Sequence, residues 1–149
     1  MLGGLFTGPA VQAVAEALAS SHADATQDTV AVIGHAKLAQ ALAKNQTVLA
    51  VGLTERAAKR IPGALADLAS VETASLAAVI GVDVASDDGW EAALREWTRV
   101  VRDGGAIIFV DRGHASEASR RALCSGLTEL EQRRSGRLVV TSGLVSHVT

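Results

Sequence analysis

The stretch LAAVIGVDVASDDGWEAALREWTRVVRDGGAIIFVD, residues 76–111, decides the fold. Its first quarter is almost entirely apolar, which predicts a buried central strand. The acidic pair at residues 87–88 predicts the cap of a helix, because negative charge is favourable at a helix N-terminus, and this helix is predicted to end at Asp103-Gly104. A second apolar run, residues 106–110, predicts the next strand. A strand, a helix and a strand in succession are typical of the crossover between parallel strands.

From residue 29 onward, short runs rich in Val and Ile alternate with segments of helical periodicity. This alternation predicts an α/β three-layer sandwich: a mostly parallel sheet of about seven strands with helices on both faces. The predicted strands are residues 29–33, 47–51, 68–71, 76–84 and 106–110, and two β-prone runs within residues 137–148, around Ser142-Gly143, are predicted to pair as an antiparallel edge hairpin. The other predicted helices are residues 8–21, 36–44, 54–60 and 115–134.

The chain is expected to form a single domain. Residues 29–149 make up the domain itself, and residues 1–28 form an N-terminal segment and helix that pack on it. Three apolar residues, Leu2, Leu5 and Phe6, precede this helix and have no obvious position in the core. We therefore predict that they bind a protein partner.

The composition excludes several classes of function. Basic residues number 14 and acidic residues 16, so the net charge of -2 provides no cationic field for nucleic acid or anionic lipid. Arg133, Arg134 and Arg137 are predicted to complement the end of the last helix. Cys124 is the only cysteine, and no apolar run approaches the ~20 residues that span a bilayer. We expect a cytoplasmic protein that binds neither nucleic acid nor a membrane.

The segment RVVRDGG, residues 99–105, carries a family resemblance. Here the end of a helix passes through two glycines into the next strand, and the strand before the helix presents Asp83 near its end. In this order, the stretch resembles the second half of a small class I S-adenosylmethionine-dependent methyltransferase, and the same register extends back to Thr29. The resemblance implies a Rossmann-like sheet, with S-adenosylmethionine as the family's cofactor.

The resemblance also implies which residues would contact that cofactor. The family's first strand enters a glycine-rich loop, whereas here the strand is followed by Gly34-His35, with one glycine and about two residues too few for close backbone approach. The second strand ends near Gly52, where the family places an acidic residue for the ribose hydroxyls. The residues that match cofactor-binding positions are Gly34, His35, Gly52, Glu55 and Asp67. Because the loop is short, we expect cofactor binding to be reduced or absent.

Polar residues follow the predicted strands at the edge where α/β sheets bind their ligands. Asp83 is the candidate catalytic residue, since the family presents its catalytic group at this position. Asp111 and His114 can serve as an acid and a base. The four histidines have no metal-ligand spacing, so no metal site is expected.

Three functions are compatible with these patterns. The leading hypothesis is a non-catalytic methyltransferase-like protein that acts as an interaction, regulatory or structural subunit, binding either a copy of itself or a dedicated partner. The alternative is an S-adenosylmethionine-dependent methyltransferase with an atypical cofactor loop and an unknown acceptor. The third is a domain that binds nicotinamide or another nucleotide, although GHAKLA at residues 34–39 is no dinucleotide fingerprint.

Overall fold

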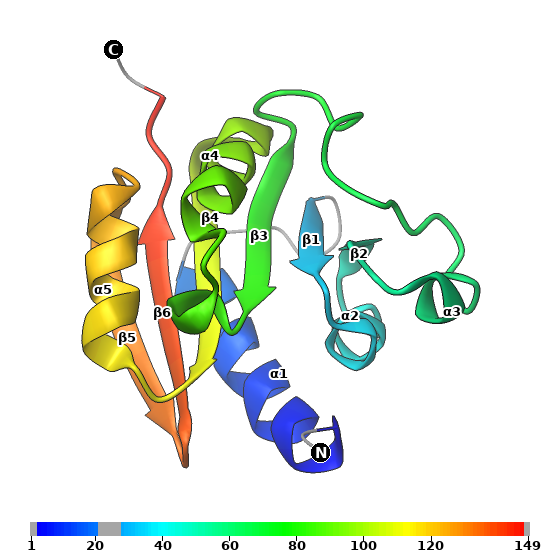
Figure 1. Ribbon diagram of the computed structural model, residues 1–149, viewed down its shortest axis with the longest axis horizontal. Helices are drawn as coiled ribbons and strands as arrows, with labels where there is room; N and C mark the ends of the chain where they lie inside the picture. The colour runs from blue at the N-terminus through cyan, green and yellow to red at the C-terminus, as the bar shows by residue number, and fades with distance from the viewer. Residues whose placement is uncertain (1–2, 21–27, 148–149) are drawn as a thin grey trace.

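A computed structural model describes residues 3–20 and 28–147 of the chain. The strands are β1 (Thr29–Ile33), β2 (Thr47–Val51), β3 (Leu76–Val82), β4 (Val101–Arg112), β5 (Thr128–Ser135) and β6 (Leu138–Leu144). They form one mixed sheet with the order β2-β1-β3-β4-β6-β5 (Figure 1). The first four of these are parallel to one another, whereas β6 is antiparallel to both β4 and β5. The predicted α/β class, with a mostly parallel sheet and an antiparallel edge hairpin, is confirmed.

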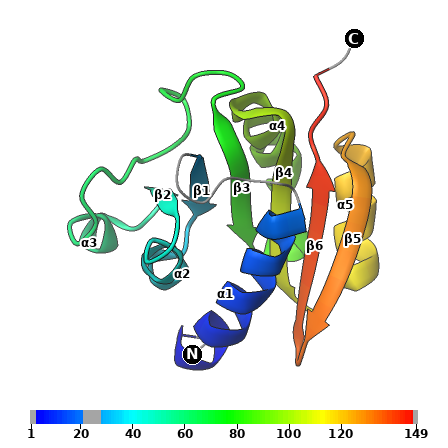
Figure 2. The same cartoon turned by 180° about the vertical axis from the view of Figure 1, so that it is seen from behind.

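Helices cover both faces of the sheet, as predicted. The helices are α1 (Gly3–Ser20), α2 (Ala36–Leu42), α3 (Glu55–Ala58), α4 (Trp90–Val100) and α5 (Ala115–Cys124), and a 3-10 turn, η1 (Val84–Ser86), follows β3. α1 and α2 pack on one face, and α4 and α5 on the other (Figures 1 and 2). Strand residues alternate between the two cores: Ile80 and Ile108 face α1 and α2, whereas Val79 and Ile107 face α4 and α5.

A glycine pair near the start of β4 shapes the exit from α4. The helix ends at Val100 and passes directly into the strand. Gly104 has a φ of 81°, and a side chain at Gly105 would lie 2.5 Å from the carbonyl oxygen of Ala77. The helix predicted to reach Asp103 therefore ends earlier, because the last residues of that segment already belong to the strand.

The predicted strand at residues 68–71 is wrong. Only Leu65 pairs with β2 on its outer side, as an isolated parallel bridge to Val51, so the sheet within the described residues has six strands instead of about seven. The carbonyl oxygens at both ends of the segment accept hydrogen bonds from the Arg99 guanidinium, at 2.9 and 3.0 Å. A side chain from α4 therefore satisfies carbonyls that a neighbouring strand would otherwise bind.

The C-terminal elements also differ from the prediction. The helix predicted for residues 115–134 ends at Cys124, because Gly126 adopts a φ of 84° that the helix cannot continue. β5 and β6 then pair around Gly136, which has a φ of 60°. The hairpin predicted within residues 137–148 therefore lies earlier in the chain.

This shift changes the environment of several polar residues. Arg133 and Arg134 lie on β5 and Arg137 follows it, so the cationic cluster does not complement a helix end as predicted. Ser142-Gly143, predicted as a turn, lies inside β6 between β4 and β5.

α1 packs against α2, β4 and β6. It begins at Gly3, before the predicted start at Gly8. Leu2 lies outside the described residues, and so do the side chains of Leu5 and Phe6. Their role in binding a partner stays a prediction.

Candidate functional site

The carboxyl ends of β1 and β3 form the switch point of the sheet. The two strands are neighbours, but α2 after β1 packs on one face and α4 after β3 on the other. Ligands of open α/β sheets bind at such a point. Gly34 and His35 follow β1 and Asp83 follows β3, so the structure brings three of the predicted residues to one edge. The charge of Asp83 acts on the His35 ring across this edge.

Gly34 and Gly52 adjoin each other at the ends of β1 and β2. Both have a φ of 71°, which disfavours any residue with a side chain. The Gly34 amide donates to the Val51 carbonyl at 2.7 Å, and the Gly52 amide donates to the Leu65 carbonyl at 2.9 Å. A side chain at Gly34 would meet nothing within 4 Å, so the backbone here is open to approach.

The His35 side chain caps α2. Its Nδ1 accepts a hydrogen bond from the Leu38 amide at 3.0 Å, which satisfies one of the unpaired donors of the first helical turn. Burial lowers the pKa of His35, although a hydrogen bond between the ring and the backbone of His35 itself and the charge of Asp83 oppose the shift. The ring is therefore neutral at neutral pH, and the neutral ring can accept this bond.

The two acidic residues matched to the cofactor site lie in different local settings. Thr54 caps α3 by accepting from the Ala57 amide at 3.2 Å, and Glu55 is the exposed first residue of that helix. Asp67 accepts from the Ala69 amide at 2.9 Å in a tight turn.

Asp83 has a left-handed backbone conformation, with a φ of 58°. Its amide donates to the Val110 carbonyl at 2.8 Å, which ties the end of β3 to β4. Its carboxylate lies 3.5 Å from the Arg112 guanidinium in an ion pair at the surface. The following helix is capped by Gly89, not by Asp87 or Asp88 as predicted.

Asp111 lies near the end of β4 and is buried beneath η1, so its role as an acid or base stays a prediction. It is 1% exposed, and its Oδ1 accepts from the Ala85 amide at 2.8 Å. Its Oδ2 has no hydrogen-bond partner among the described residues. Burial raises the pKa of Asp111, and the charge of Asp83 raises it further, whereas the Ala85 hydrogen bond lowers it. His114 is exposed and begins α5 with a φ of 60°.

Arg121 helps to hold the segment that follows Asp83, a role that the sequence analysis did not predict. Its Nη1 donates to the carbonyl oxygens of Val84 and Asp87 at 2.7 and 2.8 Å, and its Nε donates to Glu117. Asp111 accepts a hydrogen bond from an amide of η1, and Arg121 donates to a carbonyl of η1. The two side chains together hold η1 in place directly after Asp83. Only the i, i+4 spacing of Glu117 and Arg121 is visible in the sequence, and it predicts an ordinary surface pair.

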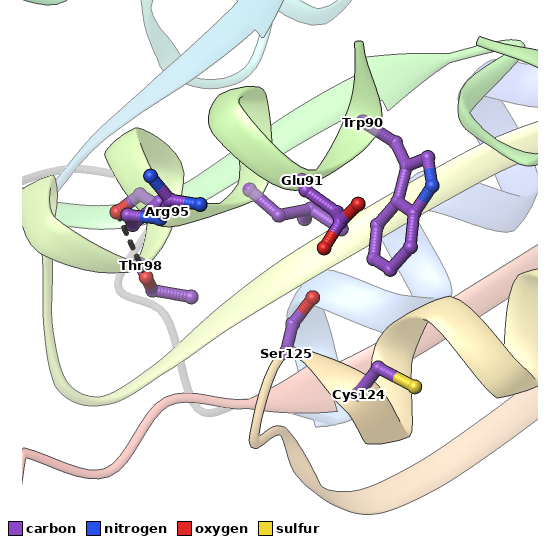
Figure 3. Close-up of a pocket in the computed structure, with 7 residues that line it drawn as sticks. Trp90, Glu91, Arg95, Thr98, Cys124 and Ser125 are labelled. Carbon is purple, nitrogen blue, oxygen red and sulfur yellow. Dashed lines mark hydrogen bonds between the residues drawn. The ribbon is translucent and has the colours of Figure 1, made fainter. Parts of the chain in front are cut away.

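Two larger cavities lie elsewhere: one between α4 and the end of α5 (Figure 3), and one between α4 and residues 125–127 and 145–147. One of about 230 Å³ is lined by Trp90, Glu91, Leu94, Arg95, Thr98, Cys124 and Ser125. An adjoining one of about 250 Å³ shares Arg95, Thr98 and Ser125 with it and extends to His147. We call these two cavities together the α4–α5 groove. None of the four cavities described in residues 3–20 and 28–147 is lined by Gly34, His35 or Asp83.

No group of three or more His, Cys, Asp or Glu side chains among the described residues is arranged to hold a metal ion. No helix within the described ranges has both the length and the apolar character needed to cross a membrane.

The sequence matches no protein-family profile and no curated protein. The fold does match solved structures. A Methanococcus maripaludis protein assigned to the S-adenosyl-L-methionine-dependent methyltransferases has a TM-score of 0.74 and 12% identity, over 100% of this chain and 89% of its own. A chain from the complex of the Haloferax volcanii Trm112 methyltransferase activator with a protein assigned as a methyltransferase has a TM-score of 0.70 and 14% identity, over 91% and 89%. The ribosomal protein L11 methylase of Lactobacillus delbrueckii subsp. bulgaricus has a TM-score of 0.69 and 16% identity, over 91% and 78%. At these identities the likeness establishes the fold alone: the chain has the fold of the class I S-adenosylmethionine-dependent methyltransferases.

Proposed function

We propose that the protein is a methyltransferase-like domain that does not transfer methyl groups and acts by binding another protein. The observation that carries the proposal is the connection from β1 to α2, which consists of Gly34 and His35 alone. The amides of a helix N-terminus are the natural site for an anion such as the cofactor's carboxylate. Here the Leu38 amide already donates a hydrogen bond to the ring of His35.

Other positions matched to the cofactor site support the same proposal. Gly52 ends the second strand without a carboxylate for the ribose hydroxyls, and the Thr54 hydroxyl occupies an amide at the start of α3. Asp67 is engaged by its own turn. Each of these groups contributes to local structure, so a cofactor would have to displace existing hydrogen bonds, which costs about 0.5–1.5 kcal/mol for each bond lost.

The carboxylate of the candidate catalytic residue, Asp83, already has a partner in its own chain. Asp83 forms an ion pair with Arg112, and its backbone is held by Val110. A general base must reach the proton that it removes, whereas this carboxylate faces a cation of its own chain. No step of methyl transfer is therefore assigned to Asp83.

A role in protein binding is consistent with how the fold is used elsewhere. The Haloferax volcanii structure is a complex between a methyltransferase activator and a protein assigned as a methyltransferase. A protein of this fold thus has a precedent for association with a second protein. A cytoplasmic location stays a prediction.

Calorimetry with S-adenosylmethionine and S-adenosylhomocysteine tests the proposal without knowledge of an acceptor. The purified chain is expected to show no saturable binding of either ligand. The His35→Gly variant, which frees the Leu38 amide, is the matched comparison. Stoichiometric binding at micromolar concentration by the unmodified chain would overturn the proposal.

One observation favours a second candidate, an atypical S-adenosylmethionine-dependent methyltransferase. The backbones of Gly34 and Gly52 are open and adjacent, so a ligand can approach both. In that case Gly34, His35, Gly52, Glu55 and Asp67 would line the cofactor and Asp83 would face the acceptor. The same calorimetry separates the two candidates.

A further inference from the structure

We propose that η1 is a lid that opens when the carboxyl group of Asp111 loses its proton, so that pH controls access to the carboxyl end of β4. In the closed state that the structure shows, Asp111 lies buried beneath η1. In the open state this carboxyl group reaches the edge of the sheet where α/β proteins bind their ligands. The lid concerns access to that edge whether or not a cofactor binds there, so it goes beyond the proposed function.

η1 is held closed by side chains from other elements more than by its own hydrogen bonds. The two amide-to-carbonyl bonds that form the turn are both 3.4 Å long, whereas N–H···O bonds are usually about 2.7–3.2 Å. The contacts from outside are shorter. Asp111 on β4 accepts from the Ala85 amide at 2.8 Å, and Arg121 on α5 donates to the carbonyls of Val84 and Asp87 at 2.7 and 2.8 Å. A change at either side chain therefore acts directly on the closed state.

The second oxygen of the Asp111 carboxyl group makes ionisation unfavourable while η1 is closed. Oδ2 is buried and has no hydrogen-bond partner among the described residues. A carboxylate removed from water needs hydrogen bonds on both oxygens or a cation in contact to compensate for its lost hydration. Here one bond, from the Ala85 amide to Oδ1, serves the whole group. The closed state therefore favours the protonated group, whereas opening lets water reach Oδ2 and favours the ionised one.

The charges around Asp111 come from the neighbouring elements. Asp83, at the end of β3, raises the pKa of Asp111, whereas His114 and Arg121, at the start of α5 and within it, lower it. β6 places the apolar Val139 beside it. Burial is the largest influence, so the pKa in the closed state lies above the ordinary value of 3.8. The open population should rise about tenfold per pH unit between these two pKa values and stay constant above them.

The turn has a possible hinge at each end. Asp83 precedes it with a φ of 58°, and Gly89 follows it at the start of α4. Residues 86–89 are exposed, so only Val84 and Ala85 leave the core when the turn opens. Burial of these two side chains keeps the closed state the major one, and ionisation of Asp111 changes the population of the minor one.

Amide hydrogen exchange at Ala85, followed by NMR between about pH 4 and pH 8, measures the opening. After correction for the pH dependence of exchange in an unstructured peptide, protection of this amide should fall as pH rises and then become constant. Asp111→Asn keeps an oxygen that accepts from the amide but cannot ionise, so the fall should disappear. Ala85 should also be less protected than the β3 amides at every pH, because the lid opens while the sheet stays folded.

Two further variants separate the trigger from the clamp. Asp67→Asn is the matched control, because Asp67 also accepts from a backbone amide but is exposed, and it should leave the fall at Ala85 unchanged. Arg121→Lys keeps the charge but cannot bind both carbonyls. It should lower protection about two- to tenfold at every pH, as expected for the loss of one hydrogen bond, and retain the fall. Circular dichroism checks that each variant is folded.

Three results would overturn the lid. The first is protection at Ala85 that does not change with pH in the unmodified chain. The second is a fall that Asp111→Asn retains. The third is protection equal to that of the β3 amides at every pH, which would mean that Ala85 exchanges only when the whole domain unfolds. None of these results concerns S-adenosylmethionine, so calorimetry still decides the proposed function.

Discussion

Gly81→Ala tests how α4 is seated on the sheet. Gly81 lies on β3 under the ring of Trp97, and a methyl group placed there would come within 2.6 Å of the ring's Cζ3. The Cη2 atom of the ring would lie closer still, so the buried ring must retreat by more than about 1 Å to reach a normal carbon–carbon distance of about 3.5 Å. A well-packed core resists such a shift, so the substitution should cost about 1–3 kcal/mol of unfolding free energy.

A double-mutant cycle isolates the cause. Trp97→Leu removes the ring atoms that the methyl group would meet, at a cost of about 3 kcal/mol for the lost burial. In that background Gly81→Ala should be nearly neutral, because the clash is gone and alanine restricts the unfolded chain by about 0.4–1 kcal/mol. The coupling free energy between the two positions should therefore be about 1–3 kcal/mol.

Urea unfolding followed by far-ultraviolet circular dichroism measures these free energies without relying on tryptophan emission. Gly8→Ala is the matched control, since a side chain at that position on α1 would meet nothing within 4 Å. It should change the unfolding free energy by less than about 0.5 kcal/mol, because the following Pro9 disfavours a helical residue with a side chain and so offsets the helix preference of alanine. If Gly81→Ala costs the same with tryptophan or leucine at position 97, the close packing of the ring is refuted.

Three more outcomes are expected. The pKa of His35 is lowered from 6.5, so the unfolded chain binds the proton more readily and the unfolding free energy should fall as pH drops below 6.5. His35→Ala should lower the unfolding free energy by about 1 kcal/mol above that pH, because the helix cap is lost. Urea titrations at several pH values should show that the variant loses less stability than the parent as pH drops. The pKa of Asp111 is raised from 3.8, so its ionisation opposes folding and the stability of Asp111→Asn relative to the parent should increase as pH rises above 3.8; a pH-independent difference would contradict this. Arg99→Lys should speed amide hydrogen exchange in residues 68–75, because one ammonium cannot reach all the acceptors of the guanidinium, and unchanged exchange would show that Arg99 does not hold the segment.

The buried strands could be predicted because their apolar runs are local. Residues 29–33, 47–51 and 106–110 lie within observed strands, and the cap of α2 by His35 also follows from local sequence. The segment at 68–71 could not be placed, because its carbonyls depend on Arg99, which lies far along the chain.

The predicted helix at residues 115–134 fails for a different reason. Leu127 and Leu130 keep helical spacing with the residues before them, yet Leu127 lies after the end of α5 and Leu130 lies on β5, and both pack into the core beneath α4 and α5. β5 itself, TELEQRRS, is a polar edge strand without apolar alternation, so its sequence contains little strand signal.

The site shows the same division between local and distant information. The position of Asp83 after a strand follows from the apolar run that precedes it. Its pairing with Arg112 and the anchoring of η1 by Asp111 and Arg121 depend on contacts between separate βα units, which spacing alone does not reveal.

The order of strands has a consequence for synthesis. β6 lies between β4 and β5, and β5 has no direct pairing with the parallel part of the sheet. On the ribosome β5 therefore emerges before the strand that will attach it. Until β6 is inserted, the outer side of β4 remains an unpaired edge, and the nascent chain passes through an interval in which it can join a neighbouring molecule.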